Sequence, residues 1–507
     1  MTTRLERELK FELDSAAAAE DAARRGGAGA RRVSVLESVY FDTPDLDLRA
    51  RGLVFRVRRN GRRYQQTIKR QALAGGALRR WESERAIMGP RPELTAEDRA
   101  ALTQALARGK KLTLEPVFSV HSERTTWLDS ADGGEVEFAL DLGEITAGGR
   151  SSLLCELEIE LKRGGARRLF EAGRRIADAA GVHPTVLTKD DRGYRLLDDS
   201  WGRPARARQP ALTPQMPAAE AFAAIAHECL HHFLLNEGVI RQRWDSEAIH
   251  QARIAVRRLR SALSFFAPIA RGGAFEAIRR DLKWMSGELG AVRDFDVFLA
   301  RIAAPDALHR HVMGAEALAH HFARRRDGAY AALAESLASE RWRLALFAML
   351  EWLDIAPWRR RGRDQTVAKF SDRRMRRRLH RLADDAADLA AMNDDALHEI
   401  RKKAKALRYA AEFHRALAQG AGKARRHRHL VSRLEAIQGS LGKQHDVADA
   451  RALLSSLVMA EYAGGEPAML FAAGHIAAEM AAAKTKKNVA RAASLIRALN
   501  KEESFFA

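Results

Sequence analysis

The feature that most constrains the fold of this chain is a change in the spacing of its apolar residues near residue 200. Before that point, ERELKFEL, LVFRVRR, YQQTIKR and CELEIELK alternate apolar and charged residues with a period of two, which is typical of half-buried strands. After it, almost the whole sequence is Ala-, Leu- and Arg-rich and has the pattern of amphipathic helices. We therefore predict an α+β N-terminal domain at 1–200, a linker with several prolines at 201–216 and an all-α domain at 217–505.

The charge of the chain is divided unequally between these two parts. The whole chain has 86 Lys and Arg against 66 Asp and Glu. Residues 1–200 contain 35 basic and 32 acidic residues, whereas 201–507 contain 51 and 34. A basic surplus confined to the helical part indicates a polyanionic partner, such as polyphosphate, nucleic acid or anionic lipid.

The predicted strands of the N-terminal part separate acidic from basic residues. The residues that share one face of a strand are Glu6, Glu8, Lys10 and Glu12 in the first, Arg56 and Arg58 in another, and Glu156, Glu158 and Glu160 in a third. A sheet with one solvated face explains each strand alone, but it does not explain why whole strands are acidic or basic. A closed sheet with a polar interior would bring these rows together. Carboxylates would then bind a hard divalent cation, and Arg and Lys would hold anionic oxygens.

ERELK fits the ExExK signature of the CYTH superfamily, the triphosphate tunnel metalloenzymes. The segments SVYFDTPDLDLRARGLVFRVRR, QTIKR, RWESE, FALDLGEI, CELEIELK and TKDDRGYRLL follow in the family's order. The resemblance implies an eight-stranded antiparallel tunnel barrel with helices outside, and Mg²⁺ or Mn²⁺ as the cofactor. It also implies hydrolysis of inorganic triphosphate, thiamine triphosphate or RNA 5′-triphosphates, or cyclisation of ATP.

The resemblance assigns site residues by position. The implied metal ligands are Glu6, Glu8, Asp141, Glu156 and Glu158. The implied substrate contacts are Lys10, Arg56, Arg58, Lys69, Arg80, Arg124 and Lys189. The residues expected to be essential for catalysis are Glu6, Glu8, Lys10, Arg56, Arg58 and Lys69. Glu82 and Glu84 lie on the predicted strand of Arg80, and Glu160 lies on that of Glu156 and Glu158.

The helical part contains an internal repeat. His250, Arg253, Arg257 and Arg260 recur with identical offsets as His398, Arg401, Lys405 and Arg408. On a helix the four side chains of each copy fall within an arc of about 80°. Like charges on one strip are mildly destabilising, so we expect an extended polyanion to neutralise them, and arginine favours phosphate oxygens. Two copies imply a duplicated bundle.

This repeat resembles the CHAD domain, a conserved-histidine α-helical domain associated with inorganic polyphosphate, through HQARIAVRRLR, LGAVRDFDVF, HEIRKKAKALRYAAEF and LGKQHDVADA. The implied polyphosphate contacts are the eight repeat residues together with Arg293 and His445. Asp294, Asp296, Asp446 and Asp449 are expected to orient the basic groups, and Gly290 and Gly442 to permit close helix packing or a turn. The chain is therefore identified as a CYTH–CHAD fusion, similar to bacterial inorganic triphosphatases.

Several alternatives remain open at this stage. The activity could instead be that of a thiamine triphosphatase or a class IV adenylate cyclase, or the chain could be a non-catalytic polyphosphate-granule binding protein. HECLH at 227–231 fits a zinc-protease pattern, but we interpret it as part of an ordinary helix. Nucleic-acid binding has only the charge in its favour, since no zinc-finger, RRM or KH motif is present.

The remaining sequence features concern the location of the protein. Cys155 and Cys229 cannot build a disulfide framework. The start, MTTRLERELKFEL, lacks the apolar region of a secretory signal, and no uncharged apolar run of about 18 residues is present. We expect a cytoplasmic protein that does not enter a membrane, with polyphosphate granules as a candidate location. The sequence leaves the oligomeric state open.

Overall fold

The computed structural model describes residues 2–71, 80–103, 106, 110–131, 134–302, 311–361, 364–461, 466–481 and 485–499. At 2–6, 70–71, 80–82, 443–452, 458–461, 480–481 and 485–487 it describes the backbone alone. The chain divides into two compact units. Unit 1 comprises the residues up to Ala205 together with Ser336–Ala356, and unit 2 comprises Arg206–Glu335 and the residues from Pro357 onward.

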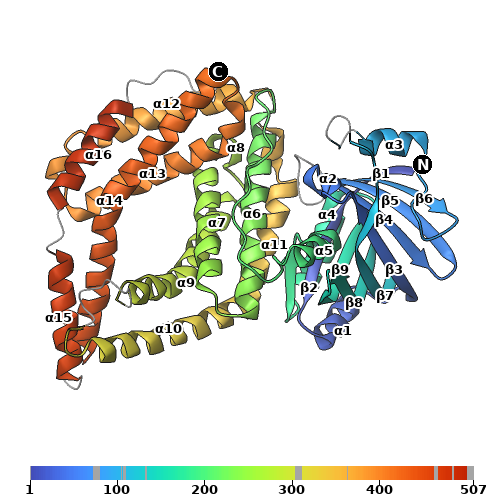
Figure 1. Cartoon of the computed structure of the whole chain (residues 1–507), viewed down its shortest axis with the longest axis horizontal. Coiled ribbons are helices and arrows are strands. Elements are labelled where there is room, and N and C mark those ends of the chain that lie inside the picture. Colours follow the sequence, from blue (N-terminus) through green and yellow to red (C-terminus); the bar gives the residue numbers. More distant parts are fainter. Residues whose placement is uncertain are drawn as a thin grey trace. The chain divides into compact units, whose positions relative to one another are not determined.

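Unit 1 is built on an antiparallel sheet that has ten strands in the described part of the chain (Figure 1). The strands are β1 (Thr2–Glu6), β2 (Glu8–Leu13), β3 (Arg32–Asp42), β4 (Leu53–Asn60), β5 (Arg63–Gln71), β6 (Arg80–Ile87), β7 (Glu115–Ala131), β8 (Gly134–Ala147), β9 (Arg150–Arg163) and β10 (Val182–Thr185). Their order across the sheet is β1-β6-β5-β4-β3-β7-β8-β9-β2-β10.

The N-terminal segment closes this sheet. We expected one first strand, but it is interrupted at Arg7, so that β1 pairs with β6 whereas β2 pairs with β9 and β10. Strand β1 lies at one end of the strand order, and β2 lies next to the other end. Because β1 and β2 are consecutive in sequence, this short segment joins the two sides of the sheet. Taken together, β1 and β2 correspond to one expected strand and β3–β9 to the other seven, while β10 is a short addition. The predicted tunnel barrel is confirmed.

Helices cover the outer surface of the sheet. They are α1 (Ala16–Arg25), α2 (Asp47–Ala50), α3 (Ala96–Thr103), α4 (Ala166–Ala177) and α11 (Glu340–Ile355). Helix α5 (Lys189–Leu197) instead packs on the inner face, where Tyr194 contacts Phe118 of β7. The apolar residues of the alternating strands pack beneath them, with Phe11, Phe55, Leu157 and Ile159 fully buried. Both faces of the sheet are therefore occupied. The outer face holds an apolar core, whereas the inner face holds the charged residues described below and an apolar cluster around Phe118, Ile145 and Tyr194.

Helix α11 lies far along the chain, yet it belongs to unit 1. The ring of Phe347 lies 6.1 Å from that of Phe11 and 5.8 Å from that of Phe170, centroid to centroid. The buried guanidinium of Arg343 donates to the carbonyl oxygens of Ala177 at 3.3 Å and Asp178 at 3.4 Å, which caps the C-terminal end of α4. We expected one continuous helical domain from 217, whereas the contacts place 336–356 with the first unit.

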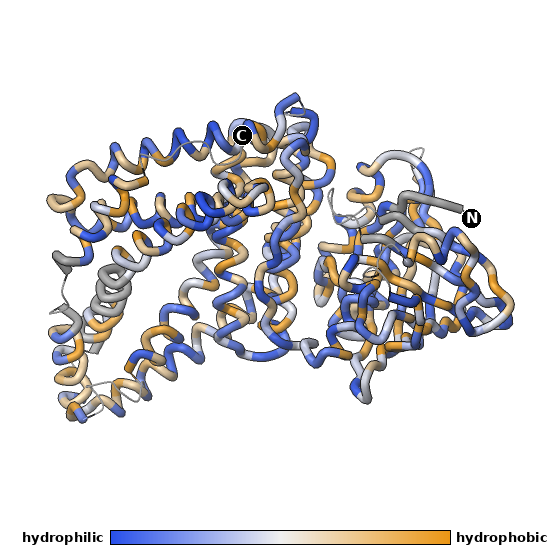
Figure 2. Tube along the Cα trace, turned by 45° about the horizontal axis from the view of Figure 1, so that its top comes forward, coloured by the Kyte–Doolittle hydropathy of each residue, from blue (hydrophilic) through white to orange (hydrophobic). Residues whose placement is uncertain are grey.

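Unit 2 is helical, as predicted. Its helices are α6 (Ala218–Gln242), α7 (Ser246–Phe265), α8 (Ala267–Ala270), α9 (Phe275–Ile302), α10 (Ala315–Ala338), α12 (Val367–Asp385), α13 (Asp394–Phe413), α14 (Ala421–Glu461), α15 (Pro467–Ala481) and α16 (Thr485–Leu499), with short 3-10 turns at Pro357–Arg360, Leu389–Ala391 and Arg415–Leu417. The last turn of α10 extends beyond the unit 2 boundary at Glu335. Hydrophobic and hydrophilic residues alternate along these helices at helical spacing (Figure 2).

The duplication is visible in the helices themselves. Helices α7 and α13 each have 20 residues and carry the two copies of the repeat. Helix α7 packs against α9, α13 packs against α14, and α7 and α13 pack against each other. Among the described helices, none is long and apolar enough to cross a membrane.

Candidate active site

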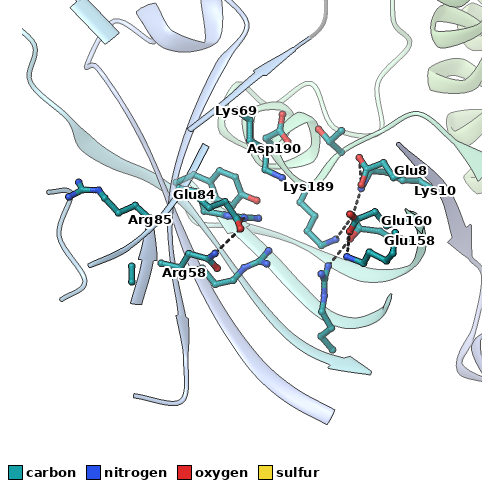
Figure 3. Close-up of a pocket in the computed structure, with 17 residues that line it drawn as sticks. Glu8, Lys10, Arg58, Lys69, Glu84, Arg85, Glu158, Glu160, Lys189 and Asp190 are labelled. Carbon is teal, nitrogen blue, oxygen red and sulfur yellow. Dashed lines mark hydrogen bonds and ion pairs between the residues drawn. The ribbon is translucent and has the colours of Figure 1, made fainter. Parts of the chain in front are cut away.

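The inner face of the sheet encloses a cavity of about 500 Å³ (Figure 3). Its lining is almost entirely charged or polar. The lining residues are Glu8, Lys10, Tyr40, Arg56, Arg58, Gln65, Lys69, Glu84, Arg85, Ala86, Arg124, Glu158, Glu160, Lys162, Thr188, Lys189 and Asp190. Strands β2, β3, β4, β5, β6, β7 and β9 and the start of α5 all contribute, so the cavity lies inside the barrel.

Strand alternation places these side chains. In β9, Glu158, Glu160 and Lys162 line the cavity, whereas the alternating residues Leu157 and Ile159 are buried in the core on the opposite face. The same period of two gives Arg56 and Arg58 on β4, flanked by buried Phe55 and Val57. Charges point inward because the outer face holds the apolar core beneath the helices.

Three carboxylates form the acidic end of the site. One oxygen atom of each of Asp141, Glu156 and Glu158 lies within 4.8 Å of the others. Lys189 Nζ lies among them, 2.8 Å from Asp141 Oδ2, 3.1 Å from Glu158 Oε1 and in direct contact with Glu156. Arg124 donates to Asp141 at 2.8 Å through Nε and to Glu158 at 2.7 Å through Nη2.

These contacts determine the charge states of the cluster. Burial alone raises the pKa of Asp141 and of Glu158, but nearby cations outweigh it, chiefly Lys189 at Asp141 and Lys10 at Glu158, so both pKa values lie below the ordinary value. Burial likewise tends to lower the pKa of Lys189, but Asp141 and Glu156 raise it well above the ordinary value. Asp141 and Glu158 are therefore ionised and Lys189 is protonated at neutral pH.

Lys10 extends this network toward Glu8. Its ammonium contacts Glu158 and lies 3.6 Å from Glu8 Oε1. Burial lowers the pKa of Lys10, but Glu158 and Glu8 outweigh that effect and raise it above its usual value. Lys10 therefore holds a positive charge beside the carboxylates.

The basic side of the cavity holds guanidinium groups that lie close enough to repel one another. Arg56 donates to Thr67 Oγ1 at 3.1 Å and lies 3.7 Å from Glu84, and Arg58 donates to Ser38 Oγ at 3.1 Å. Burial, together with repulsion from Arg56 and Arg124, lowers the pKa of the Arg58 guanidinium to about 9. A bound anion would relieve this repulsion, so the arrangement favours a polyanionic ligand.

The end of the cavity near α5 is fixed by a helix cap. Thr188 accepts a hydrogen bond from the backbone N–H of Asp191, and Asp191 accepts one from the backbone of Thr188, forming a capping box. This cap fixes the direction of the first residue of α5, Lys189, whose side chain reaches the carboxylates. The capping box of the TKDD sequence thus holds Lys189 in the orientation in which its ammonium contacts the carboxylates.

The structure brings together most of the residues that the sequence analysis selected. Glu8, Lys10, Arg56, Arg58, Lys69, Arg124, Glu158 and Lys189 line the cavity, and Asp141 and Glu156 lie directly behind it in contact with Lys189. Glu84 and Glu160 also line it. The side chains of Glu6, Arg80 and Glu82 lie outside the described residues. Sequence reasoning missed Gln65, Arg85, Lys162, Thr188 and Asp190. Of these, Gln65 and Lys162 could have been found, because each continues the alternation of a charged strand.

In unit 2, the two basic stripes come together. Lys405 lies on α13, close to Arg257 of α7. Burial, reinforced by repulsion from Arg257 on α7 and Arg401 on α13, lowers its pKa to about 7. Arg408, also on α13, has carboxylate partners: its guanidinium lies 2.7 Å from Glu412 and 3.5 Å from Glu435. The stripes therefore form one concentrated positive surface.

The two glycines of the repeat make room for arginines. A Cβ added at Gly290 in α9 would lie 2.7 Å from Arg253 Nη1, and one added at Gly442 in α14 would lie 3.5 Å from Arg401 Nη2. Both glycines lie inside helices, so close packing rather than a turn is the correct interpretation. Asp294 lies 3.7 Å from Arg253, as an orienting residue would. Asp296 instead contacts Tyr330, and the side chains of His445, Asp446 and Asp449 lie outside the described residues.

The HECLH motif lies within α6. Among the side chains that the structure describes, the group of three metal-ligand residues is Asp141, Glu156 and Glu158. The motif's histidines join no such group in this part of the chain, and the zinc interpretation gains no support.

A closed antiparallel tunnel with a charged interior, followed by a duplicated helical bundle, defines a two-domain class of protein. The CYTH domain family matches residues 4–194 and the CHAD domain family matches residues 224–455. The chain belongs to the proteins that join a CYTH domain to a CHAD domain.

Three proteins illustrate this similarity. An inorganic triphosphatase from Haemophilus influenzae is 28% identical over 170 residues, which span 32% of this chain but only 46% of that protein. An uncharacterized protein from Mycobacterium tuberculosis is 26% identical over 459 residues, covering 85% of this chain and 84% of the other. The crystal structure of the CHAD domain from the plant Ricinus communis is 30% identical with a TM-score of 0.51, covering 59% of this chain and 98% of that one.

Proposed function

We propose that unit 1 hydrolyses inorganic triphosphate to diphosphate and phosphate with the help of a divalent cation. The observation that carries this proposal is the enclosed cavity itself, in which Arg56, Arg58 and Lys69 lie opposite a cluster of ionised carboxylates. An anion with many oxygens and its cation need both kinds of group at once. The similarity to the Haemophilus inorganic triphosphatase supports the same activity.

The residues of the acidic end fit Mg²⁺ or Mn²⁺. Asp141, Glu156 and Glu158 offer hard oxygen ligands at mutual distances that one cation could span, and Glu8 lies nearby beside Lys10. The Lys189 ammonium lies among these carboxylates, and this contact supports the proposal that the cluster holds positive charge. When bound, the metal would supply Lewis-acid polarisation of phosphate oxygens and charge neutralisation.

The residues of the chain itself bind and orient the phosphate chain. Arg56, Arg58 and Lys69 hold its oxygens and stabilise charge on the departing diphosphate. Arg124 and Lys10, which bridge toward the carboxylates, position the phosphate that reacts. The closed barrel restricts water around the bound chain, which strengthens each of these electrostatic contacts.

The chemistry of the lining favours an inorganic substrate over thiamine triphosphate or ATP. Among the described lining residues, Tyr40 is the one aromatic and Ala86 the one aliphatic side chain. Tyr40 is buried against Phe118, at 4.3 Å between ring centroids. A thiazolium or adenine ring would therefore find little surface on which to stack.

The test is phosphate release by the full chain from triphosphate, thiamine triphosphate, ATP and long-chain polyphosphate, each with Mg²⁺, Mn²⁺ or EDTA. We expect the highest kcat/KM for inorganic triphosphate, and no turnover in EDTA. A higher kcat/KM for thiamine triphosphate, or formation of cAMP from ATP, would replace the proposed activity with the corresponding alternative.

Removing the Lys189 ammonium should strengthen metal binding in the absence of substrate. In Lys189→Met the carboxylates lose their internal counter-ion, so we expect the affinity for Mn²⁺, measured by EPR titration, to rise roughly ten-fold or more. Lys110→Met is the matched control, because Lys110 pairs with Asp45 and Asp47 at the surface. Weaker Mn²⁺ binding in Lys189→Met would show that the ammonium does not compete with the metal.

We also propose that unit 2 binds inorganic polyphosphate along its two facing stripes. The supporting observation is the repulsion at Lys405, which a polyanion would relieve, and the stripes are dominated by arginine. Cys155 and Cys229 are free thiols, which suits the cytoplasm as the location of the protein.

Polyphosphate affinity should fall as the pH rises through the pKa of Lys405. That pKa is about 7 in the free protein, and a bound polyanion raises it, so binding takes up a proton and weakens at higher pH. We expect titrations of the full chain with polyphosphate between pH 6 and 9 to show this decline. Lys405→Arg should reduce the decline because arginine stays protonated. An unchanged pH profile in Lys405→Arg would show that Lys405 is not the group that titrates.

A further inference from the structure

An aromatic pair lies at the junction of α6 and α7. The ring of Trp244 stacks on that of Tyr330 from α10, with 5.0 Å between centroids and 21° between planes. Tyr330 is 4% exposed, whereas Trp244 is 54% exposed. Tyr330 also donates a hydrogen bond from its hydroxyl to Asp296 Oδ2 at 3.1 Å. The buried tyrosine is therefore held in place, and the indole on top of it presents a wide apolar surface to solvent.

This aromatic pair adjoins the first basic stripe. On α9, Arg293 lies three residues before Asp296, and its guanidinium donates to the carbonyl oxygen of Ser246 at 3.4 Å. Ser246 lies two residues after Trp244 and begins α7. His250 lies one turn further along α7. Its pKa is lowered mainly by burial and secondly by repulsion from Arg293. Trp244, Arg293 and His250 therefore lie near one another around the start of α7.

The second copy of the repeat has the basic stripe without the aromatic. The residue at the position of Trp244, relative to the shared histidine, is Met392. An inorganic phosphate chain has no planar group and gains nothing from an exposed indole. A nucleobase does, since bases stack on aromatic side chains regardless of their sequence. The aromatic surface therefore indicates a ligand that combines a phosphate chain with a planar ring.

We propose that Trp244 is a stacking platform for the base of a nucleoside polyphosphate whose phosphate chain lies on His250, Arg253 and Arg293. The proposal rests on the phosphate-binding role given to this stripe above. It goes beyond that role because it makes the first half of the duplicated bundle selective for a nucleotide, while the second half recognises phosphate alone.

The test compares ATP with inorganic triphosphate, which share a phosphate chain and differ in the nucleoside. Binding is measured by calorimetry on the full chain in EDTA, in an Arg56→Ala/Arg58→Ala background that removes the phosphate grip of the tunnel. We expect ATP to bind about ten-fold more tightly than triphosphate. Trp244→Ala should bring the two affinities together, Trp244→Phe should retain most of the difference, and exposed Phe471→Ala in α15 is the surface control.

Each outcome decides the proposal. Equal affinities for ATP and triphosphate in the background chain would overturn the platform while leaving the phosphate stripe intact. Absence of binding by both would overturn the stripe and the platform together. Binding of a short single-stranded oligonucleotide that is tighter than that of ATP and depends on Trp244 would assign the surface to nucleic acid instead.

Discussion

Glu158→Gln is expected to lower kcat/KM for triphosphate hydrolysis by a factor on the order of 10³. Glu158 belongs to the acidic cluster and also contacts Lys10, Arg124 and Lys189. The substitution removes a metal ligand and releases three cations from their shared partner, so both halves of the site change together. Steady-state phosphate release with Mg²⁺ and with Mn²⁺ measures the effect.

Two controls separate this effect from misfolding. Breaking a buried ion pair also costs stability, about 3–5 kcal/mol when one partner is removed, so each variant is compared by thermal unfolding and circular dichroism. Glu144→Gln is the matched substitution, since Glu144 is an exposed carboxylate on β8. A folded Glu158→Gln protein with wild-type turnover would remove Glu158 from the site.

Phe347→Ala is expected to destabilise unit 1 by about 3–5 kcal/mol, although residue 347 lies far beyond the N-terminal sequence. Its ring fills the space between Phe11 on β2 and Phe170 on α4. Truncation leaves a cavity against the strand that carries Lys10 and Glu8. Hydrogen exchange of β2 and α4, measured by mass spectrometry in the full chain, reports this loss directly.

Gly173→Ala tests the same interface by overfilling it. A Cβ at Gly173 in α4 would lie 2.6 Å from Leu9 Cδ1 and 2.9 Å from the ring of Phe347, so we expect a cost of about 1–3 kcal/mol. Arg341→Ala, at an exposed position of α11, should change little. If a fragment ending at residue 205 folds with the same protection of β2 and α4 as the full chain, α11 is not part of the unit 1 core.

The alternating strands made the charged interior predictable. Because side chains alternate between the two faces of a strand, acidic and basic rows in ERELK, LVFRVRR and CELEIELK could be assigned to one face without knowledge of the fold. The offsets within the helical repeat likewise predicted two stripes. The sequence did not predict that the two stripes lie close together, because this depends on the packing of α7 against α13, which lie far apart in sequence.

Three features depended on long-range contacts and escaped the sequence analysis. The break at Arg7 follows from strand pairing at both ends of the sheet order, which no local pattern specifies. Helix α11 is more apolar than α10 and α12, but nothing in its own sequence assigned it to the barrel. Lys189 was expected to contact substrate, whereas the structure adds that its ammonium lies among the carboxylates.

The most direct measurement of the central claim is a crystal structure of the full chain with Mn²⁺ and inorganic triphosphate, in which anomalous scattering locates the metal. The account predicts a manganese peak at the carboxylates of Asp141, Glu156 and Glu158, with the phosphate chain inside the barrel against Arg56, Arg58 and Lys69. Manganese and triphosphate bound elsewhere, with the barrel interior occupied by water alone, would contradict it.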